Sequence, residues 1–202
     1  MTTTPITETG TPTDEDLMAA LQAGQDAALA PLMERWELGV KAFLLRLGVP
    51  SADVEDVAQE AFVRLYEKRA SYRVGASFKP WLLTLAGNLG RNRLRWRFRR
   101  REDSIEAMEE TQPGGFQHAD PSAAAQPASA LAEKANLAQN VRLAVDALPN
   151  KLREAVVCVE LEELSYNDAA EIMRCSAKAV ETRLYRARQL LRTTLQRFLS
   201  KE

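Results

Sequence analysis

The apolar residues of this 202-residue chain recur every three to four positions along most of its length, which is the spacing of helices with one buried face. This spacing is lost between residues 102 and 130, where Pro, Gly, Ala and Ser dominate. No useful length of the chain alternates apolar and polar residues, as a half-buried strand requires. The sequence therefore predicts an all-α fold of two small helical domains joined by a flexible linker.

Turn and cap residues place the helix ends. Ser51 is expected to cap a helix, Pro80 suits the first turn of another, and Pro149 ends a third. Residues 1–13 are rich in Thr and Pro and lack basic residues, so we expect a disordered N-terminus rather than a secretory signal. The expected helices cover residues 14–23, 26–47, 51–69, 78–100, 131–148, 152–161, 166–174 and 177–199.

Charge is segregated along the chain, although its net value is only −1. Residues 14–101 have 15 Lys/Arg against 11 Asp/Glu, and residues 132–202 have 12 against 10. Residues 102–120 hold six carboxylates and no Lys or Arg. Two basic domains favour a nucleic-acid-binding protein in spite of the total charge. The polyanionic linker suits a basic channel in a partner, and a solvated tether is the plain alternative.

Residues 164–188 have the form of a helix-turn-helix. Its second helix has a narrow apolar stripe through Val180, Leu184 and Ala187. The opposite face can enter a major groove, with Arg side chains beside it for phosphates. A plain helical hairpin with a solvated face is the alternative for this segment alone. The outward and flanking residues are Lys178, Glu181, Thr182, Arg183, Tyr185, Arg186, Arg188, Gln189 and Arg192.

An Arg-rich segment ends the first domain. Seven Arg lie between residues 91 and 101, interleaved with Leu94, Trp96 and Phe98, which suits a nucleic-acid backbone and base stacking. Arg surrounds the helix on every side, so a membrane-surface helix is disfavoured. Core packing is the alternative for Trp81, and a generic nucleic-acid patch for the Arg run. A polar stripe precedes and enters this segment at Thr84, Asn88, Asn92 and Arg95.

Several motifs together resemble one family. The Leu148-Pro149 pair, the Leu164-Ser165-Tyr166 run and the stretch from Val180 to Arg188 resemble region 4 of extracytoplasmic-function (group IV) sigma factors of the sigma-70 family. The segment DVEDVAQEAFVRLY at residues 53–66 and the helix from Phe78 resemble region 2 of the same family. The chain departs from the family pattern at Gly87, Asn92, Arg174, Lys178 and Ala179.

The resemblance implies a domain organisation. It assigns region 2 to residues 14–101, an acidic linker to 102–130 and region 4 to 131–202. It also implies a factor that directs promoter-specific initiation. Its expected partners are core RNA polymerase, through the β′ clamp helices and the β flap, promoter DNA and an anti-sigma factor.

The resemblance implies three sets of site residues. Region 2 binds core polymerase and opens and reads the minus-ten element, and region 4 reads the minus-thirty-five element. The implied polymerase-binding residues are Asp53, Asp56, Gln59, Glu60 and Arg64. The implied minus-ten residues are Tyr72, Phe78, Lys79, Trp81, Thr84, Asn88, Arg91, Asn92 and Arg95. The implied minus-thirty-five residues are Lys178, Glu181, Thr182, Arg183, Tyr185, Arg186 and Arg188.

Enzymatic activity, a cofactor and a metal site are not expected. His118 is the sole histidine and lies in the linker, and no Ser/His/Asp set or Gly-rich phosphate loop is present. Cys158 and Cys175 lack a metal-binding spacing and are expected to be reduced and partly buried. No run of eighteen apolar residues exists, so we expect no membrane insertion and a cytoplasmic location. A stand-alone helix-turn-helix regulator is the runner-up, but it leaves the Arg-rich helix unexplained.

Overall fold

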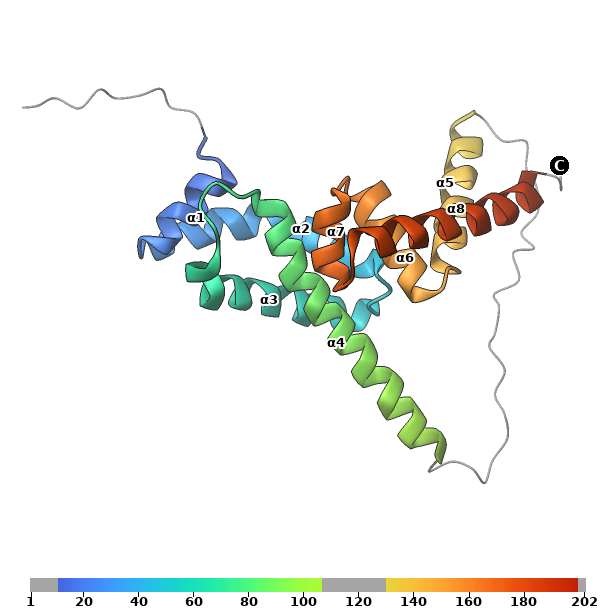
Figure 1. The fold of residues 1–202 in the computed structure, drawn as a ribbon, viewed down its shortest axis with the longest axis horizontal. Helices are drawn as coiled ribbons and strands as arrows, with labels where there is room; N and C mark the ends of the chain where they lie inside the picture. Colours follow the sequence, from blue (N-terminus) through green and yellow to red (C-terminus); the bar gives the residue numbers. More distant parts are fainter. Residues whose placement is uncertain (1–10, 107–129, 200–202) are drawn as a thin grey trace, which may run out of the picture.

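The computed structural model describes residues 11–106 and 130–199, and all regular structure in these ranges is helical (Figure 1). The all-α prediction is confirmed. The expected disorder of the N-terminus and most of the expected linker fall on residues 1–10 and 107–129, outside the described residues. The elements are α1 (Asp14–Gln22), η1 (Asp26–Ala28), α2 (Leu29–Arg46), α3 (Ser51–Lys68), η2 (Arg69–Ser71), α4 (Phe78–Glu106), α5 (Ala130–Asp146), α6 (Asn150–Val156), η3 (Val157–Leu161), α7 (Tyr166–Met173) and α8 (Ala177–Leu199).

Local signals explain most of the helix ends. At α1, the Thr13 hydroxyl accepts a hydrogen bond from the Asp16 N–H at 3.1 Å, and the Asp16 carboxylate accepts one from the Thr13 N–H at 3.0 Å, a complete capping box. The expectation that Ser51 caps α3 was wrong. Pro50 is the N-cap, and its carbonyl accepts from the Asp53 N–H at 2.8 Å, so Ser51 is the first helical residue.

Helices α1 to α4 form the N-terminal unit around a shared apolar core. Each of the four contributes side chains that are fully buried, because each presents one apolar face to the others. Helix α4 extends to Glu106, beyond the expected end near Arg100, and its last turns project away from the other helices (Figure 1). The largest buried side chains of this unit are Met18, Leu21, Leu32, Val40, Phe43, Leu44, Leu65, Phe78, Leu82 and Leu83.

Helices α5 to α8 form the C-terminal unit. The expected single helix at residues 152–161 divides into α6 and the π-helical turn η3. Helices α7 and α8 form the predicted helix-turn-helix, and Val180, Leu184 and Ala187 of α8 are buried, with α8 packed on both α6 and α7. Ile172 of α7 is also fully buried and faces Gly87 of α4. The predicted inner stripe of α8 is therefore confirmed.

The two units pack against each other. Helix α7 lies on α4 (Figure 1), and the buried apolar residues of both units form one continuous cluster. Nothing local in the sequence predicted this contact, which joins residues more than sixty positions apart. None of the helices in the described parts of the chain has the length and apolar character needed to span a bilayer.

Candidate polymerase and DNA interfaces

The outward face of α3 is polar and accessible. Asp56, Gln59, Glu60 and Arg64 are all exposed, and Arg64 pairs with Glu60 at 3.7 Å. The apolar face of the same helix is buried in the core, so this polar face is rigidly presented. Four of the five residues predicted to bind the polymerase thus share one exposed surface.

Asp53, the fifth predicted residue, is placed differently. Its side chain is only 19% exposed, and its carboxylate pairs with Arg97 at 2.8 Å and with Arg93 at 3.6 Å. These two arginines come from α4. Asp53 therefore links α3 to α4 through these ion pairs and is not freely accessible to solvent.

An open hollow of about 300 Å³ lies between α3 and α4. It brings Glu60 of the polymerase-binding set beside Asn92 of the minus-ten set, and Trp96 at its edge is 47% exposed. The two predicted surfaces are therefore neighbours on one side of the N-terminal unit. The lining residues are Val57, Glu60, Leu89, Asn92, Arg93 and Trp96.

The loop before α4 ends in a cluster of aromatic rings. Tyr72 and Phe78 are only 3% and 1% exposed, and Tyr72 packs edge-on against Trp81 with ring centroids 5.2 Å apart. The Tyr72 hydroxyl donates to the Ala76 carbonyl, and burial raises the pKa of this phenol, with the charges of Glu15 and Asp14 adding to the effect. Tyr72 and Phe78 were predicted to contact the minus-ten element, but here both rings belong to the core and are not available for stacking on bases. Trp81 and Lys79 remain partly exposed.

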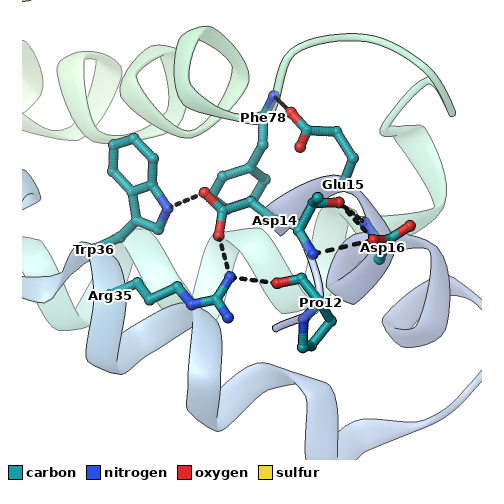
Figure 2. A network of polar contacts seen from close by, with 8 residues as sticks. Pro12, Asp14, Glu15, Asp16, Arg35, Trp36 and Phe78 are labelled. Atoms are coloured by element: carbon teal, nitrogen blue, oxygen red, sulfur yellow. Dashed lines mark hydrogen bonds and ion pairs between the residues drawn. The ribbon is translucent and has the colours of Figure 1, made fainter. Parts of the chain in front are cut away.

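Helix α1 contacts both the loop and the start of α4. Figure 2 shows the contacts made by the first residues of α1. The Glu15 carboxylate accepts from the Phe78 N–H at 3.0 Å and so caps α4. Asp14 is fixed by Trp36 Nε1 at 2.8 Å and by Arg35 Nη1 at 3.0 Å. These contacts fix the start of α1 against both α2 and α4.

The far end of α1 holds the start of the loop. The Gln22 amide donates to the carbonyls of Arg69 and Tyr72, both at 2.7 Å. The sequence analysis did not anticipate these roles of Asp14, Glu15 and Gln22. Acidic residues in the first turn of a helix are common and do not by themselves predict a contact with a distant loop.

The polar stripe of α4 is divided between free and occupied side chains. Asn92 and Arg95 are exposed. The Thr84 hydroxyl donates to the Pro80 carbonyl at 2.8 Å, and Asn88 accepts from Arg91. Arg91 itself pairs with Glu154 of the C-terminal unit, and Lys79 is bound to Glu162 of that unit. Two predicted DNA-binding cations are therefore engaged inside the protein.

The outward face of α8 is accessible, as predicted. The Lys178 side chain is 80% exposed and Tyr185 is 64% exposed. Thr182, Glu181 and Arg186 are also exposed. This face has the position and the chemistry of a recognition helix.

The flanking arginines of α8 have partners in the C-terminal unit. Arg183 is half-buried and donates to Cys175 Sγ at 3.3 Å. Arg188 is exposed and pairs with Glu160 of η3. Both stand at the rim of the recognition face, where phosphate contacts are expected.

Two family models match the chain. Sigma-70 region 2 matches residues 32–101, and sigma-70 region 4 matches residues 138–191. The chain is 33% identical to the ECF RNA polymerase sigma-E factor of Escherichia coli strain K12, over 91% of this chain and 95% of that protein. It is 30% identical to the RNA polymerase sigma-H factor of Pseudomonas aeruginosa, over 92% and 95%. The chain belongs to the extracytoplasmic-function sigma factors of the sigma-70 family.

Two solved structures have the same fold. CnrH, in complex with the cytosolic domain of CnrY, matches with a TM-score of 0.62 at 24% identity, over 91% of this chain and 97% of that one. The sigma factor RpoE of Bartonella quintana, in complex with the anti-sigma factor NepR, matches with a TM-score of 0.56 at 22% identity, over 82% and 97%.

In this sigma factor the region 2 match begins at residue 32, after α1. The contacts of α1 with the loop before α4 are thus made by a segment that precedes the matched part. The region 4 match includes all of α7 and most of α8. Both regions occur in the family order, so the stand-alone regulator is not favoured.

The cysteines have no metal-binding surroundings. Among the described residues, no group of three His, Cys, Asp or Glu side chains could hold a metal ion. Cys158 is fully buried and Cys175 is half-buried, which confirms the expectation of partly buried thiols. Burial raises the pKa of Cys158 to about 12, and Glu154 adds to the shift. Cys158 is therefore an inert core thiol.

Proposed function

We infer that this sigma factor binds core RNA polymerase and directs promoter-specific transcription initiation. Region 2 opens and reads the minus-ten element, and region 4 reads the minus-thirty-five element. The observation that supports this most strongly is that one chain presents two separate polar helix faces, on α3 and α8, in regions matched in the family order. A regulator that bound only duplex DNA would need the polar face of α8 but not that of α3.

The domain limits and the site residues are part of the proposal. Region 2 extends over residues 14–101 and region 4 over residues 131–202, which places α1 in region 2 because of its contacts with α2 and α4. The exposed residues of α3 receive the basic side chains of the polymerase clamp, since carboxylates and amides accept hydrogen bonds from them. On α4 the first DNA contacts are Asn92 and Arg95, which are exposed.

The residues on the recognition face of α8 have two roles, base reading and phosphate binding. Lys178, Thr182 and Tyr185 point away from the core and are placed to reach base edges. Arg186 and Arg188 are placed to bind phosphates, which adds affinity without sequence preference. Arg188 must release Glu160 to do so.

An anti-sigma factor is a further proposed partner. The CnrH and RpoE structures are complexes with CnrY and with the anti-sigma factor NepR, and their folds match this chain over most of its length. The protein itself performs no chemistry, because the polymerase holds the active site, and it acts where the polymerase acts, in the cytoplasm.

Run-off transcription with purified bacterial core polymerase tests the function. Core polymerase with this protein should initiate at discrete sites selected from a genomic promoter library, whereas core alone should not. Charge reversal of Asp56 and Glu60 should abolish initiation and weaken co-purification with core, with an unchanged circular dichroism spectrum. Binding of duplex DNA without any initiation on core polymerase would instead identify a stand-alone regulator.

A further inference from the structure

The hollow between α3 and α4 has both apolar and charged walls. Val57 of α3 is buried and Leu89 of α4 is half-buried, and together they supply an apolar floor. The Glu60 carboxylate and the Trp96 indole line the same hollow. Its volume of about 300 Å³ is at the low end of the range for ligand pockets, which is about 300–1,000 Å³. The hollow therefore suits a single long side chain of a partner.

The Trp96 indole differs from the other two tryptophans in its exposure. Trp36 and Trp81 pack against the buried core cluster, whereas Trp96 is 47% exposed. Arg100 Cζ lies 4.7 Å from the centroid of the Trp96 ring. A guanidinium in this position is attracted by the electron-rich face of the indole. The ring thus already receives a cation from its own chain, and its chemistry suits a cationic side chain from a partner.

Trp96 lies on a different side of α4 from the predicted DNA contact Arg95. At about 100° per residue, Trp96 is rotated by about 100° from Arg95, and Arg93 by about 160°. Arg93 pairs with Asp53 of α3 at 3.6 Å, so this side of α4 turns toward α3. Asn92, at about 60°, stands between the two sides. The hollow is therefore a neighbour of the minus-ten stripe and is turned toward the polymerase-binding helix.

The charges around the hollow favour a cation. Of the described residues that line it, Glu60 is the only acid and Arg93 the only base. The Arg93 charge is offset by Asp53, whereas Glu60 has only Arg64 at 3.7 Å. Asp56, one turn before Glu60, is exposed and has no ion pair among the residues that the structure describes. An incoming cation is attracted by these two carboxylates, and a nucleotide phosphate is repelled by them.

An arginine side chain matches all of these walls. Long cationic side chains bury their apolar stems on apolar surfaces, which Val57 and Leu89 provide here. The guanidinium is planar, so it can stack on the Trp96 indole and donate a pair of hydrogen bonds to the Glu60 carboxylate. A lysine ammonium binds as a point charge and lacks the planar stacking.

We propose that the hollow between α3 and α4 is an anchor pocket for one arginine of core RNA polymerase, with Trp96 as its aromatic wall and Glu60 as its counter-ion. This rests on the proposed function, in which the exposed face of α3 binds the polymerase. The pocket extends that surface onto α4, to a residue outside the polymerase-binding set of the family pattern. Side chains that fill a pocket at an interface carry a large share of its binding energy.

The affinity of full-length variants for purified core polymerase, without DNA, tests the pocket. Competition against fluorescently labelled parent protein measures it. Trp96→Leu keeps an apolar side chain and removes the aromatic face, so it should weaken binding by roughly fivefold to thirtyfold. Trp96→Phe should recover part of the loss, because it restores a ring. Glu34→Gln, at an exposed acid of α2, is the control for Glu60→Gln and should bind like the parent.

A single occupant predicts coupling between its two contacts. In Trp96→Leu/Glu60→Gln the loss of affinity should be smaller than the product of the two single losses, since the second substitution acts on an arginine that has already lost its place. Losses that multiply fully would mean two separate partner groups and would overturn the proposal. Thermal unfolding checks that each variant folds, and Trp96→Phe gives a second, milder cycle with Glu60→Gln.

Nucleic acid is the competing occupant of the pocket. Binding of the free variants to a fluorescent single-stranded oligodeoxynucleotide of random sequence distinguishes it, and Trp96→Leu should match the parent. Weaker oligonucleotide binding with unchanged binding to core polymerase would assign Trp96 to base stacking and refute the pocket. Run-off transcription with the parent separates this result from failure of the proposed function. A parent that initiates on core polymerase, with a Trp96→Leu variant that binds core equally well, refutes the pocket alone.

Discussion

At the scale of single residues, Arg174 stands out because it ends α7 in a left-handed conformation, with φ 50° and ψ 52°. This backbone geometry costs a non-glycine residue about 1–3 kcal/mol, and glycine adopts it freely. The Arg174 side chain is exposed, so it loses little when removed. The turn between α7 and α8 is therefore formed at a cost in stability.

We expect Arg174→Gly to stabilise the protein by about 0.5–1 kcal/mol, after the greater entropy of glycine in the unfolded chain is subtracted. Urea unfolding followed by circular dichroism measures this change. Arg174→Ala is the control, since alanine retains the strain and should give no gain. A destabilised Arg174→Gly variant would mean that the arginine makes a favourable contact that outweighs the strain.

Cys158 gives a second residue-scale prediction. Its thiol is fully buried, and burial raises its pKa to about 12, so at neutral pH it is protonated in the folded protein. Cys175 is half-buried and should react first with a thiol reagent such as dithionitrobenzoate. Cys158 should react only on unfolding, at the global unfolding rate. Equal rates for Cys158→Ser and Cys175→Ser variants in the native state would contradict this.

At the scale of elements, α1 acts as a brace for the loop before α4. Glu15 caps α4 at Phe78, and Gln22 binds the carbonyls of Arg69 and Tyr72 at the other end of the loop. The loop is thus held at both ends by one nine-residue helix. Tyr72 in the loop and Phe78 at the start of α4 are both buried in the core.

We expect Gln22→Ala to weaken transcription from duplex promoters by several-fold, because the loop that precedes the minus-ten helix loses two hydrogen bonds. A template with a pre-opened bubble should restore most of the activity, since only strand opening is affected. The neighbouring exposed substitution Gln25→Ala is the control. Equal losses on both templates would show that α1 serves stability alone.

Helix α8 gives a prediction on sequence preference. Lys178→Ala should change the preferred minus-thirty-five sequence, since a base-reading side chain contributes about 1–3 kcal/mol of discrimination. Arg188→Ala should weaken binding to all sequences alike and reduce its salt dependence. Promoter-library selection with each variant, at two salt concentrations, separates these effects. An unchanged preference in Lys178→Ala would place Lys178 outside the base contacts.

The sequence predicted the elements well because each helix has one buried face and a recognisable end. The stripe of Val180, Leu184 and Ala187 is buried as expected, and α7 and α8 begin where the pattern placed them. It did not predict the burial of Tyr72 and Phe78, since aromatic residues in a loop suit either stacking or a core. Contacts such as Arg91–Glu154 have no local signature, because they depend on how two separate units meet.

At the scale of the whole molecule, the two regions form one apolar cluster and yet are linked through 23 residues, 107–129, that lie outside the described part. Ion pairs across the contact come from α2, α4, α6 and the end of η3. The packing between α4 and α7 joins the two regions. If this packing is broken, the length of residues 107–129 limits how far the regions can separate. The length and the charge of residues 107–129 are therefore considered separately below.

Linker length is sufficient for both promoter elements. An extended chain of residues 107–129 spans about 76–83 Å, at roughly 3.3–3.6 Å per residue, which exceeds the roughly 50–70 Å between the elements. A relaxed coil of that length averages only about 25 Å. The linker must therefore be held extended in the initiating complex, and its surplus of carboxylates over Lys and Arg suits a basic channel of the polymerase.

We expect neutralisation of Glu102, Asp103, Glu106, Glu109 and Glu110 to Gln or Asn to weaken assembly with core polymerase or to alter release of short transcripts. A neutral Gly/Ser segment of equal length in place of residues 107–129 should show part of the same defect, because it keeps the reach and loses only Glu109, Glu110 and Asp120. Competition binding to core and the ratio of abortive to full-length transcripts measure the two effects. If both variants assemble and initiate like the parent, the linker acts through its length alone.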